Sequence, residues 1–224
     1  MHDPEFRPGD NLFTNSALAI NVETGEIKWH FQYTPNESWD FDENGVHMLV
    51  DTPIGGEMRK TVAHFGRNGF FYQLDRNNGN FIQHGQYVDA IDWTKGIDPK
   101  TGKPLEYDPT KALQAYLPAT RILRGEPEAR VCPNYHGGLR WQPPSFNPEK
   151  RVIYAGSSEG CFSQKIEPVR SLPGGGLDAA GPGGRAGRVG DAKFERYGAM
   201  IAIDATTGKV RAKYNLPHDN LSGA

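Results

Sequence analysis

The chain has 224 residues, with 25 basic against 27 acidic side chains and a formal net charge of −2. This balance, without any cluster of Lys and Arg, argues against a nucleic-acid partner. No apolar run approaches the roughly 18 residues of a membrane-spanning helix, and the first residues show no signal-peptide pattern. The 27 Gly and 17 Pro residues, with short apolar runs between them, favour many turns and an all-β fold.

Three segments share one pattern: an apolar strand, a polar turn that ends in Gly, and a second strand. They are residues 17–29, 71–82 and 200–210. The Gly supplies the positive φ of a tight turn, and the Asn or Asp before it can bond its own backbone. The copies at 17 and 71 begin roughly 50 residues apart, the length of one four-stranded propeller blade. We therefore predict that residues 1–224 form about three blades, an arc of a larger β-propeller.

Between the first two copies lies an acidic turn, Thr34-Pro35-Asn36-Glu37-Ser38-Trp39-Asp40-Phe41-Asp42. Extended chain after the turn alternates its side chains, so Asp40 and Asp42 project to the same side. Two carboxylates held that close repel each other unless a cation lies between them or one holds a proton. The pair fits a site for a hard metal ion or a general base, and it also fits a solvated acidic turn.

Two further segments, and the His and Trp residues, carry weaker predictions. Residues 110–123 are the one stretch that resembles a short helix. The Gly-rich residues 173–190 have little to pack, which predicts a flexible loop between strands. The seven His residues show no close pair at metal-ligand spacing, and we expect the four Trp residues to pack between blades: Trp29, Trp39, Trp93 and Trp141.

Four motifs follow one another in a characteristic order: Arg7-Pro8-Gly9-Asp10-Asn11, the Thr-Gly-x-x-Lys-Trp turn ending at Trp29, Thr34 through Asp40, and His64-Phe65-Gly66-Arg67-Asn68-Gly69. Their order and spacing resemble the quinoprotein alcohol dehydrogenases, the methanol and ethanol dehydrogenase family that uses pyrroloquinoline quinone (PQQ). The resemblance implies an eight-bladed quinoprotein propeller with PQQ and either Ca²⁺ or a lanthanide ion on its axis. It also implies oxidation of a primary alcohol to an aldehyde, a cytochrome c-type electron acceptor and a periplasmic location.

The resemblance also suggests roles for individual residues. Asp40 falls on the family's catalytic aspartate, which acts as general base and lies at the metal. Asp42 falls where the lanthanide-using branch has an extra aspartate, but Glu43 and Asn44 look like extra residues, so Asp42 is either a metal ligand or a solvent-facing loop residue. Arg67 falls on an arginine that hydrogen-bonds the quinone oxygens. Arg140 replaces the asparagine of a Gly-Gly-x-Asn-Trp segment, and either contacts the cofactor or points elsewhere.

Cys132 and Cys161 are the only cysteines, and by resemblance they form the family's inter-strand disulfide. Two buried free thiols are the alternative. A disulfide would agree with an oxidising compartment.

Two other interpretations remain open. The chain could be a non-catalytic propeller that acts as a scaffold for protein–protein interaction. It could also be an inactive fragment, because the family's remaining metal ligands, a glutamate and an asparagine, lie upstream of the matching residues. We therefore expect the isolated chain neither to bind PQQ tightly nor to turn over alcohol.

Overall fold

The structure, a computed structural model, describes residues 4, 7–123, 126–165, 170–171, 177–178 and 195–218. Its described elements are strands in antiparallel sheets and one 3₁₀ turn, so the all-β prediction is confirmed. A hairpin joins β1 (Ser16–Ile20) and β2 (Ile27–Gln32), and a four-stranded sheet has the order β3 (His47–Ile54), β4 (Glu57–Phe65), β5 (Phe70–Asp75), β6 (Phe81–Gln86). A five-stranded sheet contains β7 (Ala129–Val131), β8 (Ser145–Asn147), β9 (Val152–Gln164), β12 (Glu195–Asp204) and β13 (Val210–Leu216). The short strands β10 (Arg170–Ser171) and β11 (Leu177–Asp178) pair with each other.

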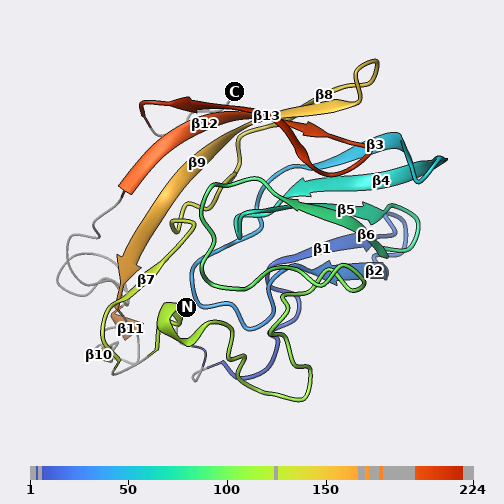
Figure 1. Cartoon of the computed structure of the whole chain (residues 1–224). Helices are drawn as coiled ribbons and strands as arrows, with labels where there is room; N and C mark the ends of the chain where they lie inside the picture. The colour runs from blue at the N-terminus through green and yellow to red at the C-terminus, as the bar shows by residue number, and fades with distance from the viewer. Residues whose placement is uncertain are drawn as a thin grey trace.

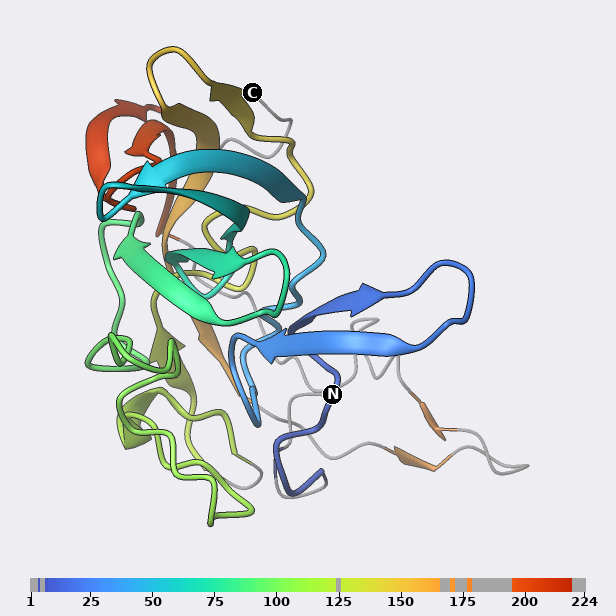
Figure 2. The same ribbon diagram turned by 90° about the vertical axis from the view of Figure 1, so that its right-hand side faces the viewer.

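The three larger units follow one another in space in chain order (Figure 1), with β3–β6 between the β1–β2 hairpin and the β9–β12–β13 sheet. Figure 2 shows the β1–β2 hairpin projecting beside the four-stranded sheet. Alternate residues of the middle sheet enter two different cores because side chains of a strand alternate between its faces. Tyr72 packs with Phe31 and Trp93 on one side, whereas Phe71 packs with Ile153 and Ile203 on the other. The middle sheet is therefore buried on both faces, as a blade between two neighbours is.

The three predicted hairpins are present, and their turns are built alike. In each turn the backbone N–H of the first residue donates to the carbonyl oxygen five residues later, and the carbonyl oxygen of that first residue accepts from the N–H of the Gly. These hydrogen bonds are 2.8–2.9 Å long. The turns are Asn21–Glu26, Asp75–Asn80 and Asp204–Lys209. The glycines have φ of 68–74°. A fourth turn of the same design, Asp98–Lys103, was not predicted. Only one isolated bridge, between Ile97 and Pro104, flanks it, so the strand pattern that marks the other turns is absent.

Neighbouring sheets are joined through these turns. Trp29, on β2, donates from its indole Nε1 to the carbonyl oxygen of Arg76 at 3.1 Å. A Cβ on Gly79 in that turn would lie 2.5 Å from the Trp29 ring, so only Gly permits the contact. At the next joint Gln83, the equivalent residue on β6, donates to the carbonyl oxygen of Ala205 at 3.4 Å.

The predicted helix over residues 110–123 is wrong. The structure has only a 3₁₀ turn, η1 (Pro118–Thr120), in this stretch. Pro118 removes a backbone donor and disfavours helical geometry in the residue before it, and Tyr116 has a φ of 36°. The predicted flexible loop at 173–190 lies outside the described residues, apart from 177–178.

Candidate active site

The acidic turn lies in the connection from β2 to β3, and Asn36 fixes its start. The Asn36 side chain donates to the carbonyl oxygen of Gly9 at 2.9 Å, while its own Oδ1 accepts from the backbone N–H of Gln114 at 3.1 Å. The Arg121 guanidinium donates to the Asn36 carbonyl oxygen at 3.1 Å. Asn36 adopts a φ of 48°, a conformation that Asn tolerates better than most residues. Segments distant in the sequence therefore hold the turn in one conformation.

Asp40 stands between two anchored aromatic residues. Trp39 and Phe41 are fully buried, and the Trp39 indole donates to the carbonyl oxygen of Thr120 at 2.6 Å. Asp40 itself is half-buried, Asp42 is exposed, and Asp40 has a φ of 70°. The Trp39 and Phe41 rings pack in the core. Because Asp40 has a positive φ, the chain here is not the extended segment that the sequence analysis assumed, and projection of both aspartates to one side stays a prediction.

Glu37 stabilises this turn through hydrogen bonds from the main chain. Its Oε1 accepts hydrogen bonds from the backbone N–H groups of Trp39 and Phe41, the second at 3.0 Å. Burial raises the pKa of Glu37 to about 7, opposed by these two hydrogen bonds and reinforced by the negative charges of Asp40 and Asp42.

Arg67 follows β4 and reaches the acidic turn. Its Nη1 lies 3.2 Å from Asp42 Oδ2 and donates to the Asp42 carbonyl oxygen at 3.3 Å. On the other side, Nε donates to the carbonyl oxygen of His136 at 3.2 Å and Nη2 donates to that of Tyr135. The Arg67 side chain is only 1% exposed. A permanently charged group this deeply buried needs such partners.

Arg140 also interacts electrostatically with Arg67 and the two aspartates. Burial and the positive charge of Arg67 lower its pKa, whereas the carboxylates of Asp40 and Asp42 raise it. Its Nε is buried and has no hydrogen-bond partner among the described residues. Of the four residues that the sequence placed at a site, Asp42 and Arg67 are in direct contact, and Arg140 lies within electrostatic range of Asp40, Asp42 and Arg67.

A buried cluster beside this site was missed by the sequence analysis. Glu43 Oε2 accepts from the Arg67 backbone N–H at 3.1 Å and lies 2.8 Å from His64 Nε2. His64 stacks on His47 with ring centroids 3.9 Å apart, and the Tyr33 hydroxyl lies 3.0 Å from His47 Nε2. His47 and His64 are directly paired across β3 and β4, a relationship that only the strand register reveals.

The hydrogen-bond partners indicate which of these groups hold protons. His64 Nδ1 lies 3.4 Å from the Val46 carbonyl oxygen and His47 Nδ1 lies 3.2 Å from that of Gly45. A carbonyl only accepts, so each ring carries a proton on Nδ1. Burial lowers the pKa of His64 to about 4 and raises that of Glu43 to about 8. At neutral pH the His64 ring is therefore neutral and accepts at Nε2, and Glu43 donates to it as a neutral acid. For His47, burial and then His64 lower the pKa to about 4.

Cys132 and Cys161 form a disulfide. The bond continues the pairing of β7 with β9, in which Val131 faces Phe162. The alternative of two free thiols is therefore wrong for this structure.

Two expectations concern the packing of the Trp residues and the binding of a metal ion. Trp39 and Trp93 are fully buried, but Trp141 is 54% exposed, so its predicted packing role is wrong. Among the described residues, no three His, Cys, Asp or Glu side chains form a group that could hold a metal ion. Within the described residues, a metal ion at Asp40 and Asp42 would therefore have no third carboxylate or imidazole ligand.

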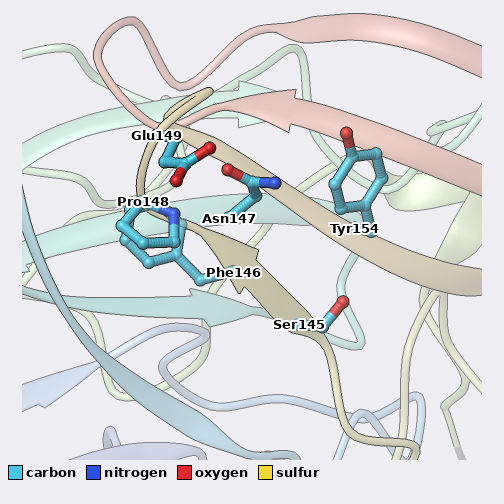
Figure 3. A pocket seen from close by; sticks show the side chains of 6 residues that line it. All are labelled: Ser145, Phe146, Asn147, Pro148, Glu149 and Tyr154. Carbon is cyan, nitrogen blue, oxygen red and sulfur yellow. The ribbon is translucent and has the colours of Figure 1, made fainter.

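A surface depression of about 470 Å³ lies elsewhere, along β8 and the start of β9. Figure 3 shows its lining side chains, which come from β8, the turn after it and β9: Ser145, Phe146, Asn147, Pro148, Glu149 and Tyr154. It contains none of the four residues of the candidate site.

Comparison with known proteins gives a consistent relationship. Residues 5–86 match the PQQ family model, described as the β-propeller domain of glucose, ethanol and alcohol dehydrogenases. Quinoprotein alcohol dehydrogenase PedH of Pseudomonas putida is 37% identical over 205 residues, covering 91% of this chain and 32% of PedH. PedE of the same organism is 35% identical over 202 residues, covering 90% of this chain and 31% of PedE. The chain thus spans about a third of the length of these relatives.

Solved structures extend the similarity to the fold. A europium-containing methanol dehydrogenase superimposes with a TM-score of 0.79 at 26% identity, covering 100% of this chain and 37% of that protein. The quinohemoprotein alcohol dehydrogenase of Comamonas testosteroni gives a TM-score of 0.76 at 28% identity, covering 96% of this chain and 31% of that protein. The successive sheets are therefore blades of a β-propeller. The chain is homologous to the quinoprotein alcohol dehydrogenases and corresponds to part of their PQQ β-propeller.

Proposed function

We propose that this chain is the segment of a PQQ-dependent alcohol dehydrogenase that supplies the general base, Asp40, and the quinone-facing arginine, Arg67. The observation that carries the proposal is the contact between Asp42 and Arg67, with Arg140 in electrostatic range of both and of Asp40, from three separate stretches of the chain. A scaffold protein has no need for a buried guanidinium group paired with an exposed carboxylate, because buried charge is costly.

The residues present fit the cofactor. PQQ is a planar, anionic quinone, and the buried Arg140 Nε without a described partner is a donor suited to such a group. Arg67 would contact the quinone oxygens with the one Nη2 hydrogen that its acceptors among the described residues leave unused, with Arg140 beside it. Asp40 and Asp42 would contribute carboxylate oxygens to Ca²⁺ or a lanthanide ion, and the additional charge of Asp42 suits a trivalent ion.

In the reaction, PQQ supplies the hydride acceptor and the metal ion supplies Lewis acidity. An Asp40 carboxylate oxygen accepts the hydroxyl proton of a primary alcohol as its carbon loses hydride, leaving an aldehyde. Trp39 and Phe41, both fully buried, hold the main chain on either side of that base. Arg67 remains charged throughout and stabilises negative charge at the quinone oxygens.

The test is a chimera in which this chain replaces the matching third of PedH. With PQQ and a metal ion, the chimera should reduce an artificial dye when given a primary alcohol. Asp40→Asn should lower this rate by about 10³-fold, since it removes the general base, while the absorbance of bound PQQ persists. Asp51→Asn, which removes an exposed carboxylate paired with Arg76 on the surface, is the matched control and should leave the rate unchanged. A folded, PQQ-loaded Asp40→Asn chimera with full turnover would disprove the assignment.

The chain on its own is expected to bind PQQ weakly and to show no turnover, since its described residues lack a third metal-ligating side chain near Asp40 and Asp42. The disulfide supports a periplasmic location, because disulfides persist in oxidising compartments. None of the helical segments in the described residues has the length and hydropathy needed to cross a membrane. A cytochrome c-type protein is the proposed electron acceptor.

A further inference from the structure

The guanidinium of Arg67 donates hydrogen bonds to main-chain carbonyls that lie far away in the sequence. Its Nε and Nη2 donate to the carbonyl oxygens of His136 and Tyr135, the first at 3.2 Å. These acceptors belong to residues 132–138, here called the clamp segment. Main-chain carbonyls can orient a side chain only if their own segment is held in place.

The clamp segment is fastened to β9 at three points. The disulfide joins Cys132 to Cys161, and the fully buried Asn134 donates from Nδ2 to the Glu159 carbonyl oxygen at 3.0 Å and to Ser158 Oγ at 3.3 Å. The Ser158 N–H donates to the Gly138 carbonyl oxygen at 2.6 Å. Figure 1 shows β7, which leads into this segment, lying along the end of β9.

Asn134 also shapes the segment internally. Its Oδ1 accepts from the His136 N–H at 2.9 Å, and its carbonyl oxygen accepts from the Gly137 N–H at 2.6 Å. One buried side chain thus links the strand to the turn that carries both acceptor carbonyls.

Two glycines bring the clamp segment close to Arg67. A Cβ on Gly137 would lie 2.4 Å from the Arg67 Cβ and 2.6 Å from its Cα, and Gly137 has a φ of 72°. A Cβ on Gly138 would lie 2.3 Å from the hydroxyl of Tyr87, which donates to the carbonyl oxygen of Gly66 at 2.8 Å. Any larger residue at 137 would push the turn and the arginine apart.

We propose that the clamp segment positions the Arg67 guanidinium. Asn134 fixes the place of the Tyr135 and His136 carbonyl oxygens, and Gly137 allows these carbonyls to approach Arg67. The relevance of the clamp segment to the quinone rests on the proposed function, but the arrangement itself does not. Asn134 and Gly137 are thus positioning residues, because they act on Arg67 and not on a substrate.

The test uses the chain itself, without PQQ or alcohol. Phenylglyoxal modifies accessible arginines, and mass spectrometry of peptides measures the rate at each one. Asn134→Ala should raise the modification rate of Arg67 by about tenfold, since lost hydrogen bonds favour local opening. Arg121, also buried and held by Asn36 in a different loop, is the internal reference and should stay slow.

A pair of glycine variants separates close approach from backbone strain. Gly137→Ala should raise the Arg67 rate similarly. Gly25→Ala meets the same strain at a φ of 74° but has no atom within 4 Å of its new Cβ, so both arginines should keep their rates. Continued protection of Arg67 in either Asn134→Ala or Gly137→Ala, or a parallel rise at Arg121, overturns the proposal. Because neither PQQ nor turnover is measured, failure here leaves the proposed function intact.

Discussion

Asp42 Oδ2 lies 3.2 Å from Arg67 Nη1, although the Asp42 side chain is 61% exposed and the Arg67 side chain is 1% exposed. Water can replace Arg67 as a partner of Asp42, whereas the buried arginine depends on acceptors from the protein, which include main-chain carbonyls as well as this carboxylate. The Asp42 carbonyl oxygen accepts from the same nitrogen at 3.3 Å. The proposed metal ligand is thus also a support for the proposed quinone-facing residue.

The first prediction concerns this pair. Asp42→Asn should lower the free energy of unfolding by about 1 kcal/mol, because the exposed partner is screened and the backbone acceptor remains. Urea unfolding measures the change. Asp51→Asn, at a surface pair with Arg76, is the control and should cost less than about 0.5 kcal/mol. A loss above about 3 kcal/mol would mean that the carboxylate is Arg67's essential partner.

The second prediction concerns the pH dependence of stability. Burial raises the pKa of Glu43 from 4.5 to about 8, so between these values the folded state keeps a proton that the unfolded chain has released. This contribution is fully present below pH 4.5 and is lost as the pH rises through 8. Glu37 acts in the same direction up to pH about 7, whereas His47 and His64 act oppositely between about 4 and 6.5.

Glu43 therefore dominates among these groups from pH 7 to 8, where stability should fall by about 1 kcal/mol. Glu43→Gln should flatten this fall, because the amide can donate to His64 from the position of Oε2 without ionising. It cannot also accept from the Arg67 N–H there, so the overall stability should be lower at every pH while its slope disappears. Urea midpoints at pH 7.0, 7.5 and 8.0 test it. Glu57→Gln, at a side chain 74% exposed, should keep the slope. An unchanged slope in Glu43→Gln would refute the neutral-acid assignment.

Sequence reasoning succeeded where local chemistry decides the structure. The turns at Asn21, Asp75 and Asp204 are specified by an Asx side chain and a Gly four residues later, both of which are visible in the sequence. The Asp98 turn uses the same chemistry, but without flanking strands it carried no pattern. Asp40 and Asp42 were found because the sequence shows two carboxylates with a single residue between them.

The remainder of the site depends on tertiary contacts. Glu43 looked like an inserted loop residue, yet it binds His64 across 21 positions and the backbone of Arg67 across 24. The partners of the Arg67 side chain include the carbonyls of Tyr135 and His136, and any residue type supplies a carbonyl. No side-chain pattern could therefore mark them.

The third prediction concerns the disulfide. Replacing Cys132 and Cys161 together by Ser should lower the free energy of unfolding by about 3 kcal/mol, because the bond closes a loop with a sequence separation of 29 in the unfolded chain. Urea unfolding under oxidising conditions measures the loss. The same wild-type chain in a reducing buffer should match the double variant. A difference below about 1 kcal/mol would mean that the pairing of β7 with β9 holds without the covalent link.

The fourth prediction concerns the anchor of the acidic turn. Trp39→Phe should cost about 2–3 kcal/mol, since it removes the indole hydrogen bond to Thr120 and leaves unfilled volume beside Trp93 and Tyr116. Urea unfolding gives the total loss. The matched control is Trp141→Phe at a 54% exposed side chain, which should change stability by less than about 0.5 kcal/mol. If both variants lose the same amount, Trp39 does not anchor the turn. If only Trp39→Phe is destabilised, the position of Asp40 depends on a tryptophan whose partner carbonyl lies 81 residues further along the chain.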